Sequence, residues 1–232
     1  MPSEIGNHRL ALSRMLQLAS TMLPVGAYSY SQGLEWAIES GTVHDANTAQ
    51  LWVNDVLHIY QTSFELPVLQ RLYQAWQAGD ESAISTWDAF FKAGRDTAEA
   101  LAETRQMGYS LRRLLNDLQQ LPADFLAKLN RLNEPAFPTV YAGAACLWQI
   151  GAQDMLHTYA WSWMENQVSA AMKTIPLGQV AGQKIMLALG QLLPQIIEQA
   201  MQLHDDEISN FAPALSMAGC LHETQYSRLF RS

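Results

Sequence analysis

The chain has 232 residues, 49% of them hydrophobic, and carries a formal net charge of −8. So many apolar residues exclude a mainly disordered chain, and the negative charge argues against binding to nucleic acid or to an anionic membrane surface. Alanine, leucine and glutamine together number 81, whereas valine, isoleucine and threonine number 29. Because the first group favours helices and the second favours strands, the composition predicts an all-α fold.

Helical periodicity covers most of the first half of the chain. Apolar residues recur every three or four positions, and Pro and Gly mark the breaks between these segments. The pattern predicts helices over residues 10–19, 31–40, 47–62, 67–78, 82–93 and 96–118. Gly108 is expected to interrupt the last of these helices.

The second half continues the same pattern. It predicts a short helix between Pro122 and Pro135, long helices over 138–150 and 153–173, and a last long helix that begins after Gly178. Pro194 should kink that last helix, because proline lacks the backbone N–H that a helix interior needs. A short helical stretch then runs up to Cys220, and residues 223–232 show no sustained period.

No internal repeat or flexible linker divides the chain. We therefore expect a single domain over residues 1–232, a bundle of about eight to ten helices with an N-terminal interaction segment and a C-terminal tail at residues 222–232. The two cysteines, Cys146 and Cys220, stand among small and apolar residues, which is typical of reduced thiols in a cytosolic protein. No uncharged apolar run approaches the length of a membrane span, so we expect a cytoplasmic protein.

Catalytic and metal-binding motifs are absent from the sequence. The stretch that starts at Ser29 lacks the first Gly of a nucleophile elbow, and no phosphate-binding loop occurs. His204 with Asp205 is the best metal candidate, but a solvated helix end explains it better. Arg105 is interpreted as a surface cation rather than an arginine finger. Three tryptophans at helical spacing are typical of a core rather than of an aromatic box: Trp148, Trp161 and Trp163. We therefore expect no enzymatic activity and no metal or cofactor held by this chain.

Three segments carry more polar and aromatic residues than a plain helical domain needs. Leu23–Glu35 combines two tyrosines, two serines and two glycines, as expected of an ordered loop that displays aromatic side chains. Tyr159–Gln179 places amides, one acid and Lys173 on helices that are otherwise poor in charge. His222–Ser232 combines apolar and cationic side chains, which is the chemistry of anchors in protein interfaces.

These segments resemble the UreF family of urease accessory proteins. Leu23–Glu35 is similar to that family's Leu-Pro-x-Gly segment, which continues to Ser-x-Gly-Leu-Glu. Tyr159–Gln179 resembles its Trp-x-x-Glu and Lys-x-x-Pro-x-Gly-Gln region, and the helix around Arg105 also fits. His222–Ser232 is similar to the family's His-Glu-Thr-Gln-Tyr-Ser-Arg-Leu-Phe-Arg-Ser tail.

The resemblance implies an all-α, non-enzymatic scaffold that dimerises. Such a protein binds UreD, called UreH in some organisms, and with it recruits the GTPase UreG to the urease apoprotein. That complex acts while the active-site lysine is carbamylated and two nickel ions are inserted, so nickel is handled by the complex rather than held by this chain. The alternative within the family is a GTPase-activating or gatekeeping regulator of UreG.

The resemblance also indicates partner-binding residues. Glu35 and Lys173 match positions implicated in the UreG-facing function, and the tail matches the segment that orders against UreD. The full set that we expect to bind partners is Tyr28, Tyr30, Glu35, Lys173, Tyr226, Arg228, Phe230 and Arg231. Because the tail lacks a helical period, we expect that it does not bury itself well without a partner. We expect Lys173 to lie on an interaction surface or to pair with Glu165 or Glu35.

Two other classes of function stay open from the residues alone. The chain could be an enzyme of one of two kinds. A GTPase activator would raise GTP turnover by UreG when added alone, and a helical metal-dependent hydrolase would bind a metal ion stoichiometrically. As a self-contained structural protein, it would be a monomer without partners, and the anchor residues of the tail argue against this.

Overall fold

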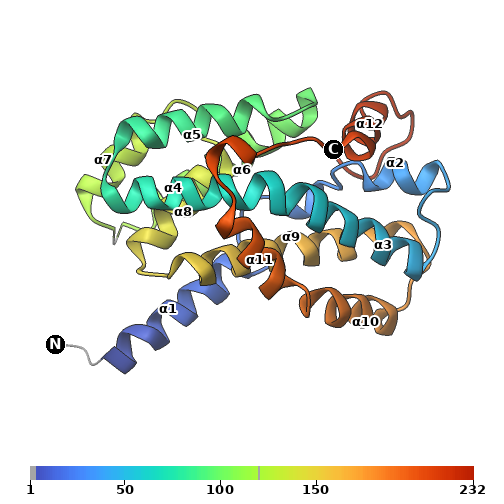
Figure 1. Ribbon diagram of the computed structural model, residues 1–232, viewed down its shortest axis with the longest axis horizontal. Helices are drawn as coiled ribbons and strands as arrows, with labels where there is room; N and C mark the ends of the chain where they lie inside the picture. The colour runs from blue at the N-terminus through green and yellow to red at the C-terminus, as the bar shows by residue number, and fades with distance from the viewer. Residues whose placement is uncertain (1–3, 120) are drawn as a thin grey trace.

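The structure is a computed structural model that describes residues 4–119 and 121–232, with side chains from Arg9 onward (Figure 1). Within those residues the chain forms helices and no strand, which confirms the all-α prediction. Expectations for residues 1–3 and 120 lie outside this description. The first half holds α1 (Glu4–Ala19), η1 (Ala27–Ser29), α2 (Leu34–Glu39), α3 (Ala46–Val56), η2 (Leu57–Glu65), α4 (Leu66–Ala78), α5 (Glu81–Ala93) and α6 (Ala98–Asp117). The second half holds α7 (Ala123–Arg131), α8 (Phe137–Leu147), α9 (Ala152–Thr174), α10 (Gln179–Gly190), α11 (Leu193–Gln202), η3 (Asp205–Glu207) and α12 (Pro213–His222).

Helix α8 occupies the centre of the molecule. Residues 138–145 of this helix are all buried, and α4 and α6 pack against it, with α5 alongside α4. The long helix α9 contacts α1, α2, α10 and α11, so it joins the central layer to the periphery. In Figure 1, α1 extends away from this body, whereas α12 and the C-terminus lie beside α2.

Helix α6 runs without interruption through Gly108, contrary to the expectation from the sequence. The glycine is instead a point of close approach between two segments. A Cβ atom added to Gly108 would lie 2.1 Å from the carbonyl oxygen of Pro135 and 2.9 Å from the carbonyl carbon of Ala136. Backbone atoms at this distance cannot move aside as a flexible side chain does, so the position requires glycine.

We expect Gly108→Ala to destabilise the fold, although alanine is the better helix former. In an exposed helix the exchange would stabilise by about 1 kcal/mol. Here overpacking against the 135–136 backbone should instead cost about 1–3 kcal/mol or more in the free energy of unfolding. Gly178→Ala is the control, because no atom lies within 4 Å of its added Cβ. Denaturant titrations that show equal stability for Gly108→Ala and the native chain would contradict this packing.

The last long helix of the sequence prediction is broken rather than kinked. It divides into α10 and α11 at residues 191–192, and Pro194 lies in the first turn of α11. In the first turn of a helix, a backbone N–H group has no acceptor within the helix. A proline at that position therefore costs no hydrogen bond, and it begins a helix instead of bending one. Among the described residues, no single helix is both long and apolar enough to cross a membrane, although α10 and α11 meet that test as a bent pair.

A π-helical segment, η2, joins α3 to α4 where the sequence predicts a gap between two helices. Pro67 in the first turn of α4 has no N–H to donate to the carbonyl of Ser63. That carbonyl oxygen accepts the backbone N–H of Ser209 instead, at 3.0 Å. The continuous backbone carries Glu65, at the end of η2, into the interior, where its side chain is 3% exposed.

Candidate partner-binding site

The N-terminal loop, residues 23–35, is ordered by left-handed backbone conformations. Gly26, Gln32 and Gly33 have φ values of 80°, 52° and 81°. At Gly33 an added Cβ would lie 3.0 Å from the Cβ of Ala218 and 3.1 Å from the nitrogen of Gly219, so α12 packs directly on the loop. The Gln-Gly pair therefore turns the chain into α2 and leaves room for α12.

The end of the tail pairs with this loop through backbone hydrogen bonds. The N–H groups of Ser31 and Gln32 donate to the carbonyl oxygen of Ser232 at 2.6 and 2.9 Å. The Ser31 hydroxyl donates to the same oxygen at 2.6 Å, and the N–H of Arg231 donates to the carbonyl of Ser29 at 2.8 Å. The loop thus provides a docking edge for residues 231–232.

Glu35, in the first turn of α2, fixes the preceding residues of the tail. Its carboxylate accepts the backbone N–H groups of Leu229 and Phe230 at 2.6 and 2.9 Å. It also lies 3.1 Å from Nε2 of His222, the last residue of α12. With three partners inside the molecule and 8% exposure, Glu35 points inward.

His222 links Glu35 to a second carboxylate. Its side chain is fully buried, and Nδ1 lies 2.8 Å from Oε2 of Glu99 on α6. Each ring nitrogen of His222 therefore faces a carboxylate oxygen. The other oxygen of Glu99 accepts a hydrogen bond from Arg228. We call Ser31, Gln32, Glu35, Glu99 and His222 the tail clasp.

The clasped tail has an inner and an outer face. Phe230 is buried, and its ring centroid lies 5.7 Å from Nζ of Lys173, which also lies 6.0 Å from the ring centroid of Tyr28. The side chain of Tyr226 is fully exposed and that of Leu229 is 63% exposed. We call the outward side chains the tail face: Tyr226, Arg228, Leu229 and Arg231.

The two tyrosines of the loop contact α9 rather than displaying their side chains. The hydroxyl of Tyr28 donates to Glu165 at 3.1 Å, and burial together with the Glu165 charge raises the pKa of this phenol. The backbone carbonyl of Tyr30 accepts Nδ2 of Asn166 at 3.0 Å. Burial, followed by the charge of Glu103, raises the pKa of the Tyr30 phenol, and Arg231 opposes this rise.

The structure thus places the expected partner-binding residues in one region but changes their environment. The prediction that the tail does not bury itself alone is wrong: it docks on the chain's own loop. Tyr30, Glu35 and Phe230 are buried within the chain. Lys173 is exposed and lies outside ion-pair distance of Glu35 and Glu165, both of which are described. Of the expected residues, Lys173, Tyr226, Arg228 and Arg231 are exposed.

Apart from Glu35, the sequence does not identify the side chains that hold the tail. Glu99, Gln32 and His222 are separated from their partners by many residues, and no local pattern indicates such pairs. The only signal was an acid or an amide at positions that periodicity assigns to the buried side of a helix, as at Glu99 and Glu103 in α6.

The weaker metal and catalytic candidates have structural partners. Glu207 accepts the backbone N–H of His204 at 2.8 Å, and Asp205 pairs with Arg71 at 2.8 Å. Arg105 lies on the surface, 3.7 Å from the carboxylate of Glu134. Across the side chains of residues 9–119 and 121–232, no group of three or more His, Cys, Asp or Glu gathers in a way that could hold a metal ion.

Residues 43–190 of the chain match the model of the UreF family. A urease accessory protein UreF from Methylobacillus flagellatus is 62% identical over 222 residues, which cover 96% of this chain and 98% of that protein. The chain belongs to the UreF family. Proteins of the same name from Azoarcus sp. (strain BH72) and Dechloromonas aromatica (strain RCB) are 50% and 49% identical, each over 96% of this chain. In this member of the UreF family, the three segments that carried the resemblance meet around the docked tail.

Proposed function

We propose that the chain is a non-enzymatic scaffold for urease maturation. Family membership supports the accessory role, because relatives named urease accessory protein UreF match this chain over nearly their whole length. The observation that carries the scaffold role is the clasped tail, which holds the tail face outward while its backbone is fixed from within. A segment ordered in advance loses less conformational entropy when a partner binds.

In this proposal the tail face, residues within the 222–232 tail, binds UreD, the protein called UreH in some organisms. Tyr226 and Leu229 supply apolar contact area, and Arg228 and Arg231 supply positive charge at the same place. Aromatic and arginine side chains are the residues that most often dominate binding energy in interfaces. A partner surface with an apolar pocket and acidic residues would complement this arrangement.

The remaining parts of the proposal rest on the family resemblance. The chain acts as a homodimer in the cytoplasm, with residues 1–232 as one domain. Together with UreD it recruits UreG to the urease apoprotein, and Lys173 beside the tail contributes to the UreG-facing surface. Nickel is cargo of the assembled complex, and the chain itself holds no resident cofactor.

We expect the double variant Tyr226→Ala/Leu229→Ala to lose UreD capture by at least about tenfold, because two exposed apolar anchors are removed. Its thermal unfolding midpoint should stay close to that of the native chain, since neither side chain is buried. Tyr109→Ala on α6, where the tyrosine is 50% exposed, is the matched control and should retain capture.

The measurement is co-purification of each variant with UreD and UreG, with and without GTP. Full UreD capture by the double variant would place the interface elsewhere. A rise in GTP turnover by UreG when this chain is added alone would contradict the non-enzymatic role.

A further inference from the structure

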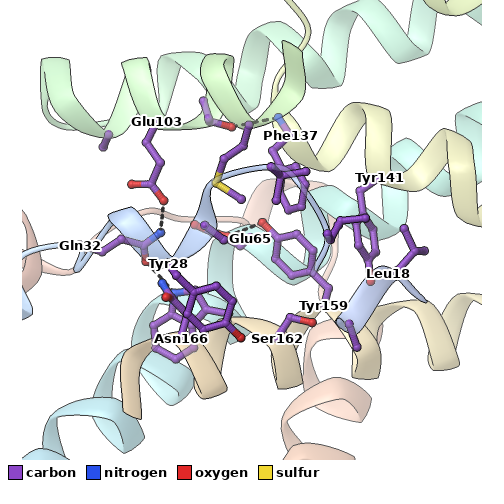
Figure 2. A pocket seen from close by; sticks show the side chains of 18 of the residues that line it. Leu18, Tyr28, Gln32, Glu65, Glu103, Phe137, Tyr141, Tyr159, Ser162 and Asn166 are labelled. Carbon is purple, nitrogen blue, oxygen red and sulfur yellow. Dashed lines mark hydrogen bonds between the residues drawn. The ribbon is translucent and has the colours of Figure 1, made fainter. Parts of the chain in front are cut away.

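A partly enclosed cavity of about 80 Å³ lies behind the loop, between α6, α8 and α9 (Figure 2). Its wall combines aromatic and apolar side chains with a few polar groups, as in small-molecule sites. Figure 2 shows Tyr141 and Tyr159 on one side, and Gln32 and Glu103 on the other. The volume exceeds that of one water molecule and suits a molecule of a few non-hydrogen atoms.

Both carboxylates in the cavity wall already accept hydrogen bonds at each of their oxygens. Glu65 accepts Nη1 of Arg95 at 2.9 Å and the hydroxyl of Tyr159 at 2.8 Å. Glu103 accepts Nε2 of Gln32 at 2.7 Å and the hydroxyl of Ser232 at 2.9 Å. These acceptors are therefore engaged by donors of the chain itself, which disfavours a cation as the occupant.

The groups without a protein partner are donors. Among the described residues, nothing accepts a hydrogen bond from Nε or Nη2 of Arg95, and the hydroxyl of Tyr141 has no partner. The side chain of Arg95 is 7% exposed, and Tyr141 is 1% exposed. The guanidinium carbon of Arg95 lies 4.1 Å from the ring centroid of Phe91, so aromatic packing holds the group in place. Buried donors of this kind are costly unless an acceptor meets them.

We propose that this cavity is a binding site for a small planar oxyanion of about the size of formate. The Nε and Nη2 groups of arginine form a fork that matches the two oxygens of a carboxylate, and the hydroxyl of Tyr141, which lines the same cavity, is a further donor. The ring faces around the guanidinium exclude water and strengthen the contact. Because the site lies within this chain, the inference is independent of the proposed partners.

The charges around the cavity determine how binding depends on pH. Arg95 and Glu65 offset each other, the phenols of Tyr60 and Tyr159 stay neutral, and burial raises the pKa of Glu103 to about 7. Glu103 therefore carries less negative charge at pH 6 than at pH 8. An anion binds more tightly when Glu103 is protonated, so affinity should fall as the pH rises, and binding should take up protons near neutral pH.

Sodium formate and the purified chain alone test this site. We expect saturable formate binding by calorimetry, tighter at pH 6 than at pH 8, with a matching rise in the unfolding midpoint. Tyr141→Phe should weaken formate binding by about tenfold, because one hydrogen bond to the anion is lost. Without formate the same variant should be at least as stable as the native chain, because an unpaired buried hydroxyl has been removed. Tyr109→Phe, at an exposed site, should change neither quantity.

Two results would overturn the proposal. One is the absence of saturable binding at tens of millimolar formate. The other is a stability loss in Tyr141→Phe without formate, together with the native response to formate, because that pattern would mean that the hydroxyl bonds to enclosed water only. Arg95 is left unchanged in these experiments, since its removal would leave Glu65 buried without its ion-pair partner.

Discussion

Glu35→Ala should release the tail and strongly destabilise the isolated chain. The substitution removes the acceptor for the N–H groups of Leu229 and Phe230 and one of the two acids beside His222. Hydrogen bonds to a charged group contribute about 1.5–3 kcal/mol each, so a loss of about 3 kcal/mol or more in the free energy of unfolding is expected. UreD capture should fall with it, because the tail face is no longer held in place.

Glu39→Ala provides the control for this substitution. Glu39 lies on the same short helix but is exposed, so its removal should change stability by no more than about 0.5 kcal/mol. Urea titrations of the three proteins measure the difference. If Glu35→Ala were as stable as Glu39→Ala, the tail clasp would not contribute to the fold.

Deletion of residues 225–232 should also destabilise the chain, in addition to abolishing UreD capture. The deletion exposes the site filled by Phe230, whose burial alone contributes about 1.5–3 kcal/mol. It also removes the partners of Ser31, Gln32 and Glu35, at about 1 kcal/mol for each hydrogen bond. We expect a clear fall in the unfolding midpoint, whereas the sequence pattern alone suggests almost none.

A double-variant comparison separates this effect from a general loss of stability. In the truncated chain Glu35 has already lost its two backbone donors, so Glu35→Ala should cost less there than in the full chain. Equal costs in the two backgrounds would show that Glu35 stabilises the fold through contacts other than the tail. An unchanged midpoint after truncation would show that the tail is not docked in the free protein.

The fold class followed from composition, which reports the preference of residues for helix or strand, and from periodicity, which reports the buried face of each segment. The excess of Ala, Leu and Gln over Val, Ile and Thr predicted an all-α chain, and the recurrence of apolar residues every three or four positions located the helices. The same patterns could not distinguish a proline that kinks a helix from one that begins a helix, as at Pro194. Nor could they show that Gly108 is a contact rather than a break.

The site was only partly accessible from the sequence. The composition of the loop and of the tail marked both as unusual, and the structure joins them. The hydrogen bonds in this region connect residues far apart in the chain. Glu35 and Leu229 are 194 positions apart, and Gln32 and Glu103 are 71 positions apart. Periodicity carries no information about such pairs. A residue such as Phe230 therefore looked like an anchor for a partner, whereas it packs inside its own chain.

Backbone hydrogen exchange of the isolated chain tests most directly whether the tail is held by its own clasp. We expect the amides of Leu229, Phe230 and Arg231 to be protected before any partner is added, and we expect Glu35→Ala to remove this protection while amides in α8 stay protected. Exchange of these three amides at the rate of an unstructured peptide, with protection appearing only when UreD is present, would contradict it.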